Sequence, residues 1–209
     1  MTTMYVDGCS FRENAVGKSG VGIVLLQGQQ QDTFSFQLGA QSSQYAEIAA
    51  VLVALQTAVD RSVQTFVICT DSNYARLSFL CHLAHWKQNG FLTSNRKPVK
   101  HKELFMACDH LVTSHDLQIY WKKVTGHSRV PGPEKICNDL ADSLAKSGAV
   151  DGSQWSFDPS WLVKVQSTQP NVEVTAVTRA QAVAEEADNT VSVQPMLSDP
   201  VLSASSAAA

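Results

Sequence analysis

The sequence predicts an α/β domain in which one mixed five-stranded sheet is flanked by helices, with the element order βββαβααβα. Two observations carry this expectation. Three stretches with strand-like patterns follow one another near the N-terminus, and beyond them helical and strand patterns alternate. A meander followed by α/β alternation is typical of a single sheet covered by helices.

The first three strands are predicted from residues that alternate between apolar and polar or run apolar. Short polar segments containing glycine or glutamine separate them, and such connections join antiparallel neighbours. The three stretches are "MYVDGCSF", "GVGIVLLQ" and "TFSFQL".

The apolar period then becomes that of a helix in "SSQYAEIAAVLVALQTAVDR", where Ser42 or Ser43 can cap the first turn. The stretch "QTFVICTD" follows and has the β-branched, apolar character of a buried strand.

The remaining elements are two helices, a strand and a last helix. The helices are "NYARLSFLCHLAHWKQNG", which Gly90 stops, and "VKHKELFMACDHLVTS", which follows Pro98. The strand "LQIYWKKV" precedes "NDLADSLAKSG", a helix that Asn138 can cap and that Gly148 ends.

Composition divides the chain into a folded part and a tail. We expect one domain over residues 1–150, a short aromatic extension over residues 151–162, and a mostly disordered acidic tail over residues 163–209. The domain carries 14 Lys/Arg and 12 Asp/Glu, whereas the rest of the chain carries 2 and 7. The tail has no aromatic residue with which to build a core.

Composition also bounds the environment of the protein. No apolar run reaches the ~18 residues of a membrane helix, and no basic segment followed by an apolar one opens the chain. We therefore expect an intracellular monomer in the cytoplasm or nucleus, neither secreted nor membrane-bound. The five cysteines are scattered without a C-x-x-C pair, which favours reduced thiols in the core.

Three acidic residues lie in apolar surroundings where a carboxylate is unexpected. Asp7 falls within the first strand, Glu47 in the first turn of the alanine-rich helix, and Asp71 at the end of the buried strand. Each has an ordinary explanation, as a turn residue, a partner of the helix dipole and a helix cap, respectively. If the first and fourth strands are neighbours, however, all three side chains can point to one place.

Carboxylates gathered in one place raise each other's pKa and are stable together mainly when cations bind. Mg²⁺ and Mn²⁺ are the hard cations that suit a site built only of carboxylates. Two such ions, about 3.5–4 Å apart, can activate a water and stabilise the leaving oxygen in phosphodiester cleavage. We expect two ions of this kind.

Six stretches, taken together, resemble the ribonuclease H family, in particular its retroviral or endogenous-retroviral type, which is associated with reverse transcriptases. They occur in the family's order over residues 4–148. The resemblance implies a ribonuclease-H-like fold and an endonuclease that hydrolyses the RNA strand of RNA/DNA hybrids at a metal site of four acids. The stretches are "YVDGCS", "QYAEIAAVLVAL", "ICTDSNYA", "WKQNGFLT…KPVKHKEL", "VTGHS" and "NDLADSLAK".

The resemblance also implies roles for single residues. Asp7, Glu47 and Asp71 match the first three metal-binding acids, and the fourth comes from the last helix. His127 matches a histidine in a mobile loop before that helix, which is thought to help protonation or product release.

Other positions match places where the family contacts nucleic acid. Gln44 matches a residue that contacts the minor groove of the hybrid, and Ser72 and Asn73 lie where the substrate backbone would pass.

The last helix carries two aspartates, and helix geometry leaves the choice between them open. Asp139 and Asp142 lie on opposite flanks of the predicted buried stripe, and a cap at Asn138 gives Asp139 a role near the positive end of the helix dipole. The family pattern is Asn, two residues, Ala and the metal-binding Asp, which "NDLAD" matches with Asp142. The predicted stripe consists of Ile136, Leu140, Ala141, Leu144 and Ala145.

Seven basic residues against three acids between Lys87 and Lys123 indicate a polyanionic partner, with a solvated helix–loop–helix as the alternative. In the resembling proteins this region forms a basic protrusion that grips the DNA strand. Relatives without it depend on a neighbouring polymerase, so this domain could act alone, with a polymerase or integrase partner if it belongs to a retroelement polyprotein. The expected contacts are Trp86, Lys87, Arg96, Lys97, Lys100 and Lys102.

Two other functions stay open. One is a domesticated, catalytically weak module that binds hybrids, and the other is an integrase- or transposase-like nuclease of the same fold. The glutamate helix "AEIAAVLVAL" argues against the latter. A zinc site is not expected, because no pair among the cysteines and histidines of the two middle helices has structural-zinc spacing. These residues are Cys81, His82, His85, Cys108 and His110.

Overall fold

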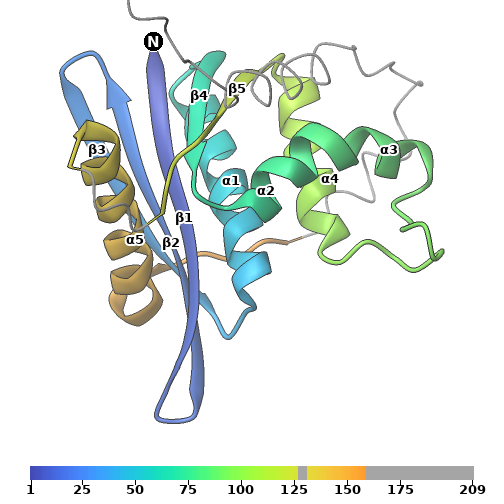
Figure 1. The fold of residues 1–209 in the computed structure, drawn as a ribbon, viewed down its shortest axis with the longest axis horizontal. Coiled ribbons are helices and arrows are strands. Elements are labelled where there is room, and N and C mark those ends of the chain that lie inside the picture. Colours follow the sequence, from blue (N-terminus) through green and yellow to red (C-terminus); the bar gives the residue numbers. More distant parts are fainter. Residues whose placement is uncertain (127–130, 159–209) are drawn as a thin grey trace, which may run out of the picture. The chain divides into compact units, whose positions relative to one another are not determined.

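A computed structural model of the chain describes residues 1–126 and 131–158. They form a mixed sheet with helices on both faces, which confirms the predicted fold class (Figure 1). His127, the end of the aromatic extension from residue 159 onward, and the predicted tail lie outside the described residues.

The described sheet has six strands, one more than predicted, in the order β5-β4-β1-β2-β3-β6. Strands β1, β2 and β3 are antiparallel, while β4 pairs parallel with both β1 and β5. The additional strand, β6, pairs parallel with β3 and is too short, at two residues, to show an alternating pattern. The bounds are Thr2–Glu13 (β1), Val16–Gln27 (β2), Gln30–Gly39 (β3), Thr65–Thr70 (β4), Gln118–Lys123 (β5) and Ser153–Gln154 (β6).

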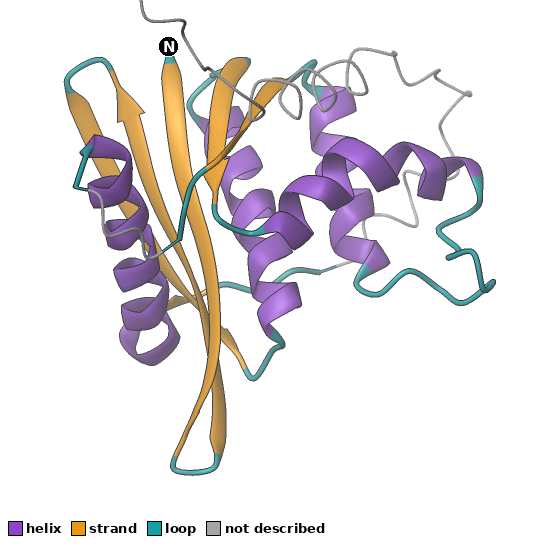
Figure 2. Cartoon of the chain, viewed as in Figure 1, coloured by secondary structure: helices purple, strands orange, loops and turns teal. Residues whose placement is uncertain are grey.

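The helices follow the predicted order, and Figure 2 shows them on the two sides of the sheet. Within the described residues, none is long and apolar enough to cross a membrane. Their bounds are Ser43–Asp60 (α1), Asn73–Leu77 (α2), Ser78–His82 (the π-helix η1), Leu83–Gln88 (α3), Lys102–Ser114 (α4) and Pro133–Asp151 (α5).

The helix predicted after β4 is not regular, because η1 interrupts it with one wider turn. A π turn inserts a residue and so rotates the side chains that follow it relative to those before it. Phe79 stacks on Trp121 of β5 at 5.2 Å between ring centroids, and Trp86 packs against Phe105 of α4 at 5.1 Å. The helix ends before Gly90, as predicted, where a φ of +64° suits glycine.

The bounds predicted for the last helix were wrong. Helix α5 starts at Pro133, whose fixed φ and missing N–H suit a first helical position, so Asn138 lies inside the helix and does not cap it. The helix also continues through Gly148. It packs so closely on β3 there that a Cβ on Gly148 would lie 2.8 Å from the carbonyl oxygen of Phe36.

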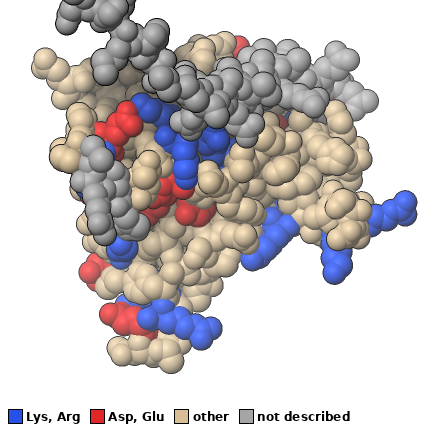
Figure 3. Space-filling view, in the orientation of Figure 1, with Lys and Arg blue, Asp and Glu red and all other residues tan. Residues whose placement is uncertain are grey.

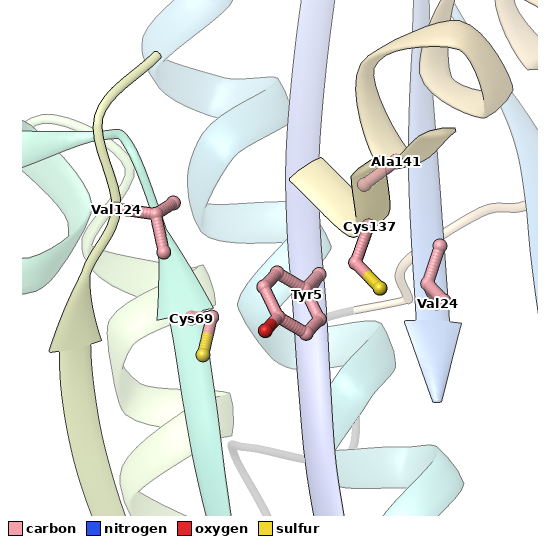
Figure 4. Close-up of a cluster of buried hydrophobic side chains, with 6 residues drawn as sticks. All are labelled: Tyr5, Val24, Cys69, Val124, Cys137 and Ala141. Carbon is pink, nitrogen blue, oxygen red and sulfur yellow. The ribbon is translucent and has the colours of Figure 1, made fainter. Parts of the chain in front are cut away.

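Helix α5 packs on one face of β1, β2 and β3, and α1 packs on β1 and β2 from the other face (Figure 2). A cluster of buried side chains lies between α5 and the sheet (Figure 4). Burial raises the pKa of Tyr5, and it raises the pKa of Cys69 to about 11, so both groups pack in their neutral forms. The cluster contains Tyr5, Val24, Cys69, Val124, Cys137 and Ala141.

All five cysteines are free, as expected, but they are not all in the core. Cys69, Cys108 and Cys137 are buried, whereas Cys9 is half-buried and Cys81 is exposed on η1.

The contact between β1 and α1 depends on Gly8, the residue after Asp7. A Cβ at this position would overlap the backbone of Ala46 and Glu47 in α1. We expect Gly8→Ala to lower the free energy of unfolding by about 3 kcal/mol, because two backbone segments must separate. Urea denaturation followed by circular dichroism measures this change.

Gly132→Ala is the matched control, since nothing lies within 4 Å of its added Cβ and its φ of 173° is extended. We expect it to cost less than about 1 kcal/mol. Equal effects of the two substitutions would contradict the proposed close approach of α1 to β1.

Candidate active site

Three elements carry the acidic residues that the sequence singled out. Asp7 lies in β1 opposite Gly22 of β2, and Asp71 directly follows β4, the parallel neighbour of β1. Glu47 lies at the start of the second turn of α1, not in the first turn as expected, because the helix begins at Ser43. Ser42 caps α1 by accepting a hydrogen bond from the backbone N–H of Tyr45 at 3.2 Å.

The first and fourth strands are neighbours, which was the condition for the three carboxylates to meet, and they do converge. One carboxylate oxygen from each of Asp7, Glu47 and Asp71 lies within 4.8 Å of the other two. Asp7 is buried, while Glu47 and Asp71 are half-buried. Within the described residues this is the one group of three or more potential metal ligands that lie this close together.

The surroundings disfavour negative charge on Asp7 and Glu47. Burial, together with the nearby carboxylates of Asp71 and Asp142, raises the pKa of Asp7 to about 6. Burial, followed by Asp7 and Asp71, raises the pKa of Glu47 to about 9, although Ser72 and Lys123 partly oppose this. An added cation would therefore stabilise the ionised cluster.

The donor set fits a hard divalent cation. All three residues offer carboxylate oxygens, the ligands that Mg²⁺ and Mn²⁺ prefer. In addition, Oε2 of Glu47 is buried and has no hydrogen-bond partner among the described residues. A buried carboxylate oxygen without a donor is costly unless a cation binds it.

Asp71 is held by residues on both sides. The side-chain amide of Asn138 in α5 donates to Oδ2 of Asp71 at 3.3 Å, and the Lys123 ammonium donates to the Asp71 backbone carbonyl. Gly126 lies so close that a Cβ there would overlap the Asp71 carboxylate. Asn138 had been expected only as a helix cap, although its position four residues before Asp142 places both on one helix face.

The two aspartates of α5 have different surroundings. Asp139 forms an ion pair with Lys135, whereas Asp142 accepts from Lys146 at 2.6 Å and lies near enough to Asp7 to raise its pKa. Asp142 is not one of the three converging acids, and its role as the fourth ligand stays a prediction.

The predicted stripe of α5 is wrong at one position. Ile136 is 67% exposed, while Ala141 and Ala145 are buried. Asn138 is buried instead, because α5 turns that face toward Asp71.

The residues expected to meet the nucleic acid differ in accessibility. Gln44 is exposed and its side-chain oxygen accepts from Lys100 at 3.0 Å. Ser72 is buried and caps α2 by accepting from the backbone N–H of Ala75 at 3.1 Å. Asn73 is exposed.

Two residues of the basic segment already have partners within the domain. Trp86 is half-buried against Phe105 and stacks on His82, which is the packing role that the alternative prediction gave it. Lys87 forms an ion pair with Asp109 at 2.8 Å.

The remaining basic residues of the segment follow α3. Arg96 and Lys97 are exposed in the loop between α3 and α4, and Lys102 opens α4 half-buried. Figure 3 shows basic side chains projecting at the lower right of this face, and acidic side chains gathered nearer its middle.

Comparison with known proteins agrees with the fold and shows the family of the chain. The sequence matches the RNase H family model over residues 1–150. The ribonuclease H of Bordetella avium is 34% identical over 148 residues, which cover 71% of this chain and 90% of that protein. The ribonuclease H of Nitrosococcus oceani is 32% identical over 138 residues, which cover 66% of this chain and 88% of that protein.

Solved structures give the same result. The solution structure of the PFV RNase H domain is 29% identical with a TM-score of 0.62, and the match covers 71% of this chain and 93% of that one. A foamy viral protease-reverse transcriptase in complex with RNA/DNA hybrid is also 29% identical, with a TM-score of 0.61 over 71% of this chain. This chain spans only 20% of the length of that viral chain.

The fold and the converging acids thus define a nuclease of the ribonuclease-H-like class. The chain belongs to the ribonuclease H family, and it is an enzyme of the phosphodiester hydrolase type.

The raised pKa values of Asp7 and Glu47 make stability depend on pH when no divalent ion is present. Their values of about 6 and about 9 lie above the ordinary values, so the folded state binds more protons than the unfolded state between about pH 4 and pH 9. The free energy of unfolding therefore falls as pH rises, by about 3 kcal/mol from about pH 6 to pH 8. Urea denaturation in EDTA measures this slope.

Glu47 contributes most to the fall in the free energy of unfolding with pH. In Glu47→Gln, the plot of this free energy against pH should therefore be much flatter than in the wild type. Identical slopes for the two proteins would contradict the burial and crowding of Glu47.

Proposed function

We propose that this chain hydrolyses the RNA strand of RNA/DNA hybrids and leaves a 3′-hydroxyl and a 5′-phosphate. The observation that carries the proposal is the convergence of Asp7, Glu47 and Asp71 within 4.8 Å, in a chain of the ribonuclease H family. A hybrid substrate is supported by the similar foamy viral enzyme, which was solved in complex with RNA/DNA hybrid.

The cofactor we propose is a pair of Mg²⁺ or Mn²⁺ ions. Asp7, Glu47 and Asp71 would hold them, and Asp142 would complete the set from α5. When bound, such ions activate a water and stabilise the leaving oxygen of the scissile phosphate. Asn138 and Lys123 keep Asp71 in place, one through the carboxylate and the other through the backbone carbonyl.

We propose that His127 moves a proton at the leaving oxygen or assists product release. Its own position lies outside the described residues, and the support comes from its neighbour. Gly126, the residue before His127 in the chain, packs directly on the Asp71 carboxylate.

The hybrid would be gripped through its shape and backbone, because A-form-like duplexes offer side chains little base sequence to read. The exposed charges of Arg96 and Lys97 suit DNA phosphates, and Gln44 with Lys100 lies at the start of α1, the helix that carries Glu47. These contacts are proposed together with those of Trp86, Lys87, Lys102, Ser72 and Asn73.

We further propose that the chain is of the reverse transcriptase-associated type. The similarity to the PFV RNase H domain and the presence of the basic segment support this. A polymerase or integrase is then a possible partner in a longer polyprotein, as the viral protease-reverse transcriptase illustrates.

Cleavage of a labelled RNA/DNA hybrid in Mg²⁺ tests the activity, with single-stranded RNA and double-stranded DNA beside it. We expect only the hybrid to be cut. Binding without cutting would favour the catalytically weak module, and cutting of double-stranded DNA would favour the integrase-like nuclease.

The choice between the two aspartates of α5 is tested in the same assay. Asp142→Asn should lower kcat by about 100-fold or more, the loss typical of a group that stabilises charge in the transition state. Asp139→Asn removes only the pair with Lys135 and should change kcat by less than about threefold. The reverse order of the two variants would overturn the assignment.

The basic segment is tested through the salt dependence of hybrid binding in Ca²⁺. Replacing both Lys97 and Lys100 by Gln should weaken binding and reduce the slope of log Kd against log salt by about 2, one unit for each phosphate contact. Arg61→Gln is the control, because Arg61 pairs with Asp32 at the far end of α1 from Glu47. An unchanged slope for the double variant would exclude these contacts.

A further inference from the structure

Helix α5 carries two lysine–aspartate pairs at the same spacing of four residues. Lys135 pairs with Asp139, and Lys146 pairs with Asp142 at 2.6 Å from Nζ to Oδ2. Pairs of this kind on a helix surface contribute little to stability, so neither pair is needed for the fold. The helix therefore offers two pairs of the same kind, one on Asp139 and the other on Asp142, the proposed fourth metal ligand.

Only one of the two lysines acts on the converging carboxylates. Lys146 lies near enough to Asp7 to oppose the rise in its pKa that burial and the neighbouring carboxylates cause, and it also acts on Cys9 two residues further along β1. The groups that shift the pKa of these two residues most include Lys146 and not Lys135. Lys146 is thus the positive charge that α5 presents to the acids of β1.

In this position, Lys146 contacts the carboxylate of Asp142, which is also the proposed metal ligand. Oδ2 of Asp142 accepts a hydrogen bond from the Lys146 ammonium at 2.6 Å, so a positive charge already lies beside this carboxylate. A divalent ion approaching the same carboxylate meets that charge, and like charges at such short range repel strongly. The ammonium and a divalent ion therefore compete for the negative charge of Asp142.

We propose that Lys146 is an internal counter-ion that competes with the divalent cation for Asp142 and thereby sets the cation concentration at which the fourth carboxylate is engaged. This inference rests on the proposed function in one respect, namely that Asp142 is a metal ligand. Lys146 is a positioning residue and takes no part in the reaction itself. Its side chain is 55% exposed, so it has room to turn toward solvent when a cation arrives.

The test is Mn²⁺ binding without substrate, followed through the electron paramagnetic resonance signal of free Mn²⁺. Lys146→Gln should tighten the weaker Mn²⁺ site by about two- to fivefold, the range that corresponds to losing an exposed ion pair. Lys135→Gln removes the same charge from the same helix and should leave binding unchanged. Lys146→Arg keeps the charge and should restore the wild-type affinity to within about twofold.

A double-variant cycle separates competition for Asp142 from a general effect of charge. In an Asp142→Asn background, Lys146→Gln should no longer alter Mn²⁺ affinity, because the contested carboxylate is absent. The same tightening in that background, or equal effects of Lys146→Gln and Lys135→Gln, would overturn the proposal.

The outcome for the metal site itself is read separately. If the wild type binds Mn²⁺ and Glu47→Gln weakens that binding, the metal site is supported whatever the effect of Lys146. If Lys146→Gln then leaves the Mn²⁺ affinity unchanged, only the role of Lys146 as a counter-ion is overturned. Absence of Mn²⁺ binding to the wild type would overturn both the metal site and the counter-ion.

Discussion

The crowding of carboxylates on a half-buried surface is the constraint on which the rest of the structure depends. Asp7, Glu47 and Asp71 bring oxygens within 4.8 Å of one another, where burial raises the pKa of the first and second. The charged forms of Asp7 and Glu47 are less stable in this arrangement than in water. The fold therefore has to hold the acids together against their mutual repulsion. A divalent cation that binds between them would offset this repulsion.

The fold achieves this by taking each acid from a different element and fixing the elements against one another. Strand β1 lies between β2 and β4 in the sheet, with α1 packed on one face and α5 on the other. Gly8 lets the backbone of α1 approach β1 directly, which places Glu47 beside Asp7. From the opposite face, Asn138 of α5 reaches Asp71. The positions of the acids are therefore fixed by how two helices pack on one sheet.

Patterns within single elements were enough to predict the fold class and to single out the three acids, because a carboxylate inside an apolar strand or at its end is visible in sequence. Their meeting was expected only if the first and fourth strands are neighbours, and the sheet order fulfils this condition. The burial of Ser72 and Asn138 depends on contacts between distant segments, which no local pattern records. The start of α5 differs from the predicted cap at Asn138 for a local reason, because Pro133 has no backbone N–H and suits a first helical position. Helix geometry alone could not choose Asp142, and the family resemblance supplied that choice.

The most direct test of the account is a crystal structure of the Asp71→Asn variant with an RNA/DNA hybrid and Mn²⁺. An asparagine can still ligate through its carbonyl oxygen, so the variant should slow cleavage without emptying the site. The account predicts two anomalous-scattering peaks held by the side chains of residues 7, 47, 71 and 142, with an RNA phosphate beside them. Mn²⁺ bound elsewhere, or a hybrid whose RNA strand lies away from these residues, would contradict it.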